Sequence, residues 1–259
     1  MSTLAPSRSR LTRVITVATA VALIAVGATL LAKAVPATTT DQTFTMDPGS
    51  RVLTVDLGRG DVRLTAGASN HLEVRRTMRF SGLKPIVEER ADANGARITT
   101  HCPALAKWVC AISYQIAVPD GYVINLHASS GAVDVRGLIM ERLRIEVASG
   151  STHMEDVTGP VEITSASGSI TGTRLGVAEF SARVASGRTN LDFALPPQLV
   201  NVAASSAAVI IQLPATDGAY GVEIITASGA EEIQVPTDPA SERQVTVSTS
   251  SGKVKLLPR

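Results

Sequence analysis

Residues 143–150 read LRIEVASG, and the same phrase returns as VEITSASG at 161–168 and as FSARVASG at 180–187. Each copy alternates apolar with mostly polar residues and closes on Ser-Gly. The closing glycines are Gly131, Gly150, Gly168, Gly187, Gly229 and Gly252, and Ala207 fills the step between Gly187 and Gly229. The steps are 19, 18, 19, 20, 22 and 23 residues long. A period this short is typical of stacked supersecondary units, not of one globular core with a cleft.

The alternation inside each copy predicts strands. In one copy Leu143, Ile145 and Val147 are apolar, and the residues between them are charged. This period of two indicates a strand with one buried face. Apolar residues also recur four places after most of the glycines, so a second strand leaves each corner; Gly172 breaks this pattern. The sequence therefore predicts an all-β solenoid with coils of about 20 residues.

A serine precedes every corner position. The structural repeat corners are Ser130, Ser149, Ser167, Ser186, Ser206, Ser228 and Ser251, each followed by glycine or, once, by Ala207. Glycine suits such a corner because it reaches positive φ without a Cβ clash. The serines are expected to hydrogen-bond to local backbone or to the serine of the adjacent coil. We interpret the column as structural, because no general base recurs beside it.

An upstream copy of the repeat closes on Gly60, within Arg59-Gly60-Asp61. Arg-Gly-Asp is a cell-attachment tripeptide in other contexts. The repeat register already explains this glycine, and the flanking charges suit an exposed turn. The sequence leaves open whether the turn is used in attachment.

The N-terminus predicts export. Residues 1–13 are basic, and residues 14–32 contain no charge. We expect 14–34 to form a transmembrane anchor with the C-terminal domain extracytoplasmic, or a signal peptide cleaved near Ala34 so that the protein is secreted. The length of the apolar run favours the anchor. Residues 35–49 are expected to be a linker, and residues 50–257 the solenoid domain.

Residues 67–119 interrupt the clear repeat and contain the two cysteines, Cys102 and Cys110. An oxidising compartment would let them form a disulfide. We expect it to pin a hairpin between residues 97–100 and the strand that follows Cys110. The last coil is expected to end the stack, with Pro258 blunting its open edge.

The sequence shows no specific motif for nucleic-acid binding, cofactor binding, metal binding or catalysis. The net charge of +1 and the absence of a basic groove argue against nucleic acid, and no cofactor motif occurs. His71, His101, His127 and His153 lack any metal-ligand spacing, and the two cysteines lack a clustered partner. Ser250 to Lys253 matches Ser-x-x-Lys, but this is also the last repeat corner. We therefore predict no catalytic, cofactor or metal site.

The Ser-Gly ladder, the cysteine segment ending at residues 114–119 and the N-terminal apolar run together resemble the bacterial "putative adhesin" family. This is a group of exported β-solenoid domains of unknown function. The resemblance covers about residues 50–257. It implies a right-handed, single-stranded parallel β-helix, often tethered to the membrane, and it supplies no catalytic positions.

Three functions remain as hypotheses. The first is a non-enzymatic, adhesin-like envelope protein whose rigid surface binds an unknown envelope protein or cell-wall glycan. The second is a scaffold that associates end to end, or a signalling ectodomain. The third is a carbohydrate-active enzyme, which would need two carboxylates at glycosidase spacing. Glu162 and Glu223 show no such pairing in the sequence.

Overall fold

The structure is a computed structural model that describes residues 36–103, 109–216 and 218–259. Its fourteen strands form one mixed sheet. They are β1 (Thr38–Met46), β2 (Val52–Arg59), β3 (Val62–Ala66), β4 (Leu72–Phe80), β5 (Ile86–Asp92), β6 (Gly95–His101), β7 (Cys110–Val118), β8 (Tyr122–Arg136), β9 (Met140–Glu155), β10 (Val161–Leu175), β11 (Glu179–Phe193), β12 (Leu199–Leu213), β13 (Gly221–Ile233) and β14 (Gln244–Pro258).

The basic N-terminus and the apolar segment at 14–34 lie outside the described residues. Within the described ranges, no helix has the length and hydropathy needed to cross a bilayer.

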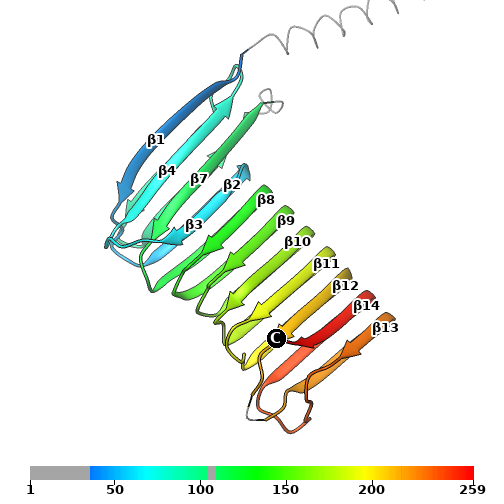
Figure 1. The fold of residues 1–259 in the computed structure, drawn as a ribbon. Coiled ribbons are helices and arrows are strands. Elements are labelled where there is room, and N and C mark those ends of the chain that lie inside the picture. The colour runs from blue at the N-terminus through cyan, green and yellow to red at the C-terminus, as the bar shows by residue number, and fades with distance from the viewer. Residues whose placement is uncertain (1–35, 104–108, 217) are drawn as a thin grey trace, which may run out of the picture.

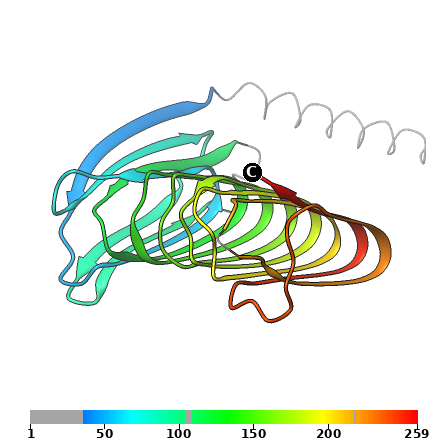
Figure 2. The same ribbon diagram turned by 60° about the horizontal axis from the view of Figure 1, so that its bottom comes forward.

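The repeat units stack as parallel coils from β8 onward (Figure 1). Each of these strands bends at its Ser-Gly step into a first arm before the corner and a second arm after it, as the view along the stack shows (Figure 2). Ser130 pairs with Ser149, and Ser149 with Ser167, so the corners are in register. The prediction of an all-β stack of 20-residue coils is thus confirmed, whereas the right-handed winding stays a prediction.

Both arms of a coil bury their apolar residues in one core. In β8, Ile124, Leu126 and Ala128 are buried before the corner, and Val133 and Val135 after it. An uninterrupted alternation would have exposed the last two. The corner shifts the alternation by one residue, so that both arms face inward. Each fully buried aliphatic side chain of this kind contributes roughly 1.5–3 kcal/mol.

The glycine column allows neighbouring corners to nest. Gly168 has φ of 140°, and a Cβ added there would lie 1.6 Å from the carbonyl oxygen of Gly150. A Cβ added at Gly150 would likewise lie 1.9 Å from the carbonyl oxygen of Gly131. Ala207 pairs with Gly187 in the column but does not adopt positive φ, and it is only 3% exposed. Its methyl group is therefore accommodated by a different corner conformation.

The N-terminal end of the stack is an antiparallel cap. β2 and β3 form the first regular coil below β8, and β6 and β7 pair with them in parallel. β4 and β5 then pair antiparallel with β7 and β6, and β1 adds to β4. Residues 38–46 are consequently a strand, and the prediction of a linker over 35–49 is wrong there. Threonine favours strands, and Phe44 and Met46 pack on the core.

The disulfide between Cys102 and Cys110 is confirmed, with a Cα–Cα distance of 6.1 Å. The hairpin that it was expected to pin is not formed. Residues 97–99 pair with β2 and β5, while β7 pairs with β3 and β4. The reason is that β6 and β7 are successive arms of one coil. The disulfide therefore closes a loop at a corner instead of joining two paired strands.

At the C-terminal end the strands do not stack in sequence order. β14 inserts between β12 and β13, so β13 is the terminal strand and the prediction that the last coil ends the stack is wrong. Pro258 pairs with Leu213 of β12 and does not blunt an open edge. Glu231 supplies the physical reason. It pairs with Val254, which is 0% exposed, and a carboxylate at this inward-facing position is tolerated only at the end of the stack.

A ladder of ion pairs runs across the outer face of the second arms. Arg63 and Arg136 both bind Asp134, at 2.9 and 2.7 Å, and Arg136 also lies 3.5 Å from Glu155. Partial burial opposes ionisation of Asp134, but the hydrogen bonds from Arg136 and Arg63 prevail and lower its pKa.

The same ladder continues at Arg174. Its guanidinium contacts Glu155 and Asp156, each at 2.6 Å, and its backbone N–H donates to the Asp192 carboxylate at 3.3 Å. The hydrogen bond from Arg174 lowers the pKa of Asp156. Arg259 binds Asp192 at 2.7 Å, so the ladder reaches from β3 to the end of β14.

We predict that Gly168→Ala lowers the free energy of unfolding by about 3 kcal/mol or more, because it adds a backbone clash to the strain of positive φ. Urea unfolding followed by circular dichroism measures this. Gly218→Ala is the control, since a Cβ there meets no atom within 4 Å. Equal stability of the two variants would contradict the nesting of the corners.

The insertion of β14 is tested by a matched pair of substitutions. Val254→Glu is expected to cost about 3–5 kcal/mol of unfolding free energy, because it buries an uncompensated charge. Glu231→Val, at the paired position, is expected to change it by less than about 0.5 kcal/mol. If β13 were the inner strand instead, thermal unfolding would show Val254→Glu to be tolerated better than expected and Glu231→Val to change the stability more.

The ion-pair ladder predicts acid sensitivity. Asp134 and Asp156 have folded-state pKa values below their usual range, so their contribution is present at neutral pH and is lost as the pH falls through those values. Unfolding free energy measured from about pH 6 to about pH 2 should decline, and Arg174→Gln should flatten the decline. An unchanged slope in the variant would argue against the ladder.

Candidate functional site

The outer face of the first arms is a mostly polar surface formed by the regular coils. Its outward residues form two columns, at six and at four places before each corner. The first column is Thr54, Asn125, Arg144, Glu162, Ser181, Asn201, Thr246 and Glu223, and the second is Asp56, His127, Glu146, Thr164, Arg183, Ala203, Ser248 and Ile225. Strand pairing holds neighbours in a column about 4.8 Å apart. The face therefore offers hydrogen-bond donors and acceptors at a fixed spacing.

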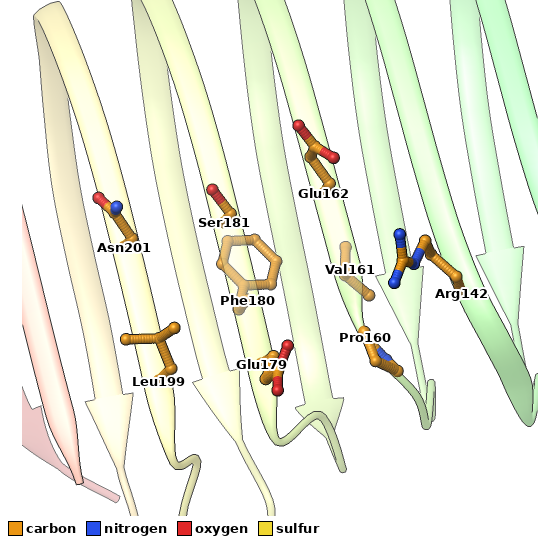
Figure 3. A pocket seen from close by; sticks show the side chains of 9 residues that line it. All are labelled: Arg142, Pro160, Val161, Glu162, Glu179, Phe180, Ser181, Leu199 and Asn201. Atoms are coloured by element: carbon orange, nitrogen blue, oxygen red, sulfur yellow. The ribbon is translucent and has the colours of Figure 1, made fainter.

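One groove on this face crosses β9 to β12 and has a volume of about 310 Å³. Figure 3 shows the side chains of Arg142, Glu162 and Glu179 spread along it. Ser181 and Asn201 add a hydroxyl and an amide, and Leu199, which is 46% exposed, adds an apolar contact. A groove of this size is at the lower end of the ligand-site range, so it suits a short stretch of a larger ligand.

A second groove of about 390 Å³ lies between β2, β6, β8 and β9. Glu146 organises it: His127 Nδ1 lies 3.0 Å from one carboxylate oxygen, and Arg144 Nε donates to the other at 3.1 Å. Asp56 and Arg97 complete the charged lining. These residues are far apart in the sequence, so the cluster was not predicted from it. A usable signal was that Asp56, His127 and Glu146 each lie four residues before a corner glycine.

The other histidines lie apart from this cluster. His71 is 4.0 Å from Glu73, and His153 on a second arm is 3.9 Å from Glu155. His101 ends β6. In the described part of the chain, no three His, Cys, Asp or Glu side chains are grouped as metal ligands.

The Arg-Gly-Asp turn has a structural role at Asp61. The carboxylate of Asp61 accepts a hydrogen bond from the Ala132 amide of the next coil at 2.8 Å. Its own amide donates to Ser113 Oγ at 3.3 Å, and Gly60 has φ of 140°. Asp61 thus ties three coils together at the corner.

The serines of the repeat corners form one continuous column, and most of them are exposed. The expected hydrogen bond to neighbouring backbone is present at Ser186, whose Oγ donates to the Ala166 carbonyl at 3.4 Å. In the Ser-x-x-Lys segment, Lys253 Nζ lies 3.6 Å from a carboxylate oxygen of Glu232. That lysine is therefore placed in an ion pair across the β13–β14 step.

The carboxylates considered for glycoside hydrolysis do not meet. Glu162 is on β10 and Glu223 on β13, four strand steps apart in the sheet. At about 4.8 Å a step, the separation is about 19 Å, well beyond the roughly 5–9.5 Å that glycosidases use. Glu179, by contrast, lines the same groove as Glu162, which sequence reasoning missed.

Solved structures of bacterial proteins match this chain at low sequence identity. A "putative cell adhesion protein" from Clostridium sporogenes shares 9% identity, with a TM-score of 0.39 over 86% of this chain and 100% of that one. A "putative adhesin" from Bacteroides fragilis also shares 9% identity, with a TM-score of 0.32 over 85% and 97%. No curated protein matches the sequence.

The family comparison is decisive because it extends over most of the molecule. The model for Toastrack DUF4097 matches residues 52–257, which include every corner from Gly60 to Gly252 and both cysteines. The antiparallel strand β1 lies before the matched region. The chain belongs to the Toastrack DUF4097 family.

Proposed function

We propose that this chain is a non-enzymatic, adhesin-like protein of the bacterial envelope that presents its solenoid as a rigid binding surface. The observation that carries the proposal is the groove on the first arms, where Arg142, Glu162 and Glu179 line a trough whose surface is partly polar and partly apolar. Four coils contribute to it, so a ligand that fills it contacts a surface fixed by the whole stack. Rigid presentation lowers the ordering cost of binding.

The ligand class follows from the groove. Guanidinium, carboxylate, hydroxyl and amide groups alternate within a few strand steps, and they recognise a chain of hydroxyl or amide groups. We propose cell-wall glycan as the ligand, with an envelope protein as the alternative.

Two features of the chain support a proposal about its location. A disulfide between Cys102 and Cys110 fits an oxidising compartment, and residues 14–32 are uncharged. We propose that residues 14–32 anchor the protein in the cell membrane with the solenoid outside. Cleavage near Ala34 and secretion are the alternative.

Co-sedimentation of the full chain with purified peptidoglycan sacculi tests the proposal. We expect the wild type to bind, and the double variant Arg142→Ala with Glu179→Ala to bind at least about fivefold more weakly, because it removes two exposed charged groups of the groove.

Arg188→Ala is the matched control, since Arg188 is exposed at the corner of β11 and lies outside the groove. It should bind like the wild type. Sacculi that fail to retain the wild type would overturn the glycan proposal. Release of soluble sugar fragments that requires Glu162 or Glu179 would instead establish a carbohydrate-active enzyme.

A further inference from the structure

The two ends of the stack differ in how they are closed. At the N-terminal end, the cap carries charges on its inward side. Arg76, which is 8% exposed, donates from Nη1 to Glu89 Oε2 at 2.7 Å, and the Tyr114 hydroxyl donates to Glu89 Oε1 at 2.7 Å. The Arg76 guanidinium also stands 6.0 Å from the Phe44 ring centroid. Inward charges of this kind discourage a further strand from adding to an edge.

The C-terminal end is built in the opposite way. β13 pairs with β14 on one side, and no described strand pairs with its other edge. On its first arm, the inward residues Val222 and Ile224 contact the core and remain partly exposed, because no strand in the described part of the chain lies over them. Ile225 and Ile233 are 56% and 44% exposed. A long unpaired strand with apolar inward residues is a template for strand addition.

The negative charge around β13 favours a basic strand at its free edge. Residues 214–242 contain no Lys, Arg or His and six acidic residues, Asp217, Glu223, Glu231, Glu232, Asp238 and Glu242. Glu232 is already paired with Lys253 and Lys255 of β14, so Glu231 is the carboxylate that matters for an added strand. Glu231 is exposed at an inward position of the second arm, where the paired residue of β14 is Val254. A strand placed over β13 would lie next to this carboxylate. A lysine or arginine there would neutralise it, and an acidic residue would be repelled.

A second copy of the chain does not satisfy these requirements. An antiparallel pairing of two β13 strands centred on Ala227 would place Glu223 of one copy opposite Glu231 of the other. A head-to-tail contact would set the apolar residues Val222 and Ile224 near the cap that holds Arg76 and Glu89. The first arrangement places two carboxylates opposite each other, and the second places apolar side chains against charged ones.

We propose that the free edge of β13 is a docking site for an extended, basic segment of a partner protein, which adds as a further strand. The segment alternates apolar residues over the first arm and carries lysine or arginine beside Glu231. This site is separate from the groove on the first arms.

Peptide binding to the full chain in detergent micelles tests the site. The probes copy residues 244–258, because β14 already pairs with the inner edge of β13. One fluorescent peptide carries Val254→Lys and the other Val254→Glu. Fluorescence anisotropy should show the lysine peptide binding at least about tenfold more tightly, with an affinity that falls at high salt.

The variant Glu231→Lys should reverse the preference between the two peptides, whereas Glu141→Lys, an exposed change on β9, should leave it unchanged. A lysine peptide N-methylated at alternate residues should lose binding, because it cannot donate the strand hydrogen bonds. The variant Arg142→Ala should retain peptide binding, so failure at the groove and failure at this edge are distinguishable.

Equal affinity for both peptides, or an unchanged preference in Glu231→Lys, would overturn the proposal. Binding that survives N-methylation would indicate simple charge attraction and would also overturn it. Sedimentation that shows filaments or dimers of the full chain, abolished by Glu231→Lys, would assign the edge to a second copy instead.

Discussion

The close approach of one corner to the next is the constraint on which this structure depends. A carbonyl oxygen of each coil occupies the space where the next corner would carry a Cβ, as between Gly150 and Gly168. Because that space is empty at the glycine corners, the coils stack there at strand spacing with their serines in register. Ala207 keeps the same register through a different corner conformation. The core and the polar columns follow from this spacing, since each is a set of residues that recurs at the same distance from the corner. The ion-pair ladder depends on the same spacing, because its partners lie on neighbouring coils.

The repeat could be predicted from the sequence because its signal is local. Alternation around Leu143, Ile145 and Val147 and the recurring Ser-Gly define the strand, its buried face and its bend without any long-range information. The cap could not be predicted in the same way. Threonines at 38–40 suited both a linker and a strand, and the pairing of β1 with β4 decides between them. Likewise, the cysteine spacing predicted the disulfide but did not show that it spans a corner.

In the candidate site, too, the local features were predictable from the sequence and the long-range ones were not. Outward positions such as Arg144 and Glu162 follow from the alternation, so the polar character of the face was predictable. The grooves depend on which coils are neighbours and on residues outside the strict repeat, such as Arg142 and Glu179. The order of β13 and β14 was the largest error. The sequence did contain a signal for this order. Glu231 lies two residues after its corner, at a position where the other coils have valine, isoleucine or threonine.

The insertion of β14 also bears on how the molecule is made. A ribosome releases β13 before β14 exists, yet β14 occupies the place between β13 and the rest of the stack. If β13 folds before β14 is synthesised, it lacks the neighbour with which it pairs in the finished structure. Val254 and Leu256 of β14 are fully buried, and β14 pairs with β12 at one edge and with β13 at the other. β14 follows β13 in the chain and yet joins β13 to the rest of the stack.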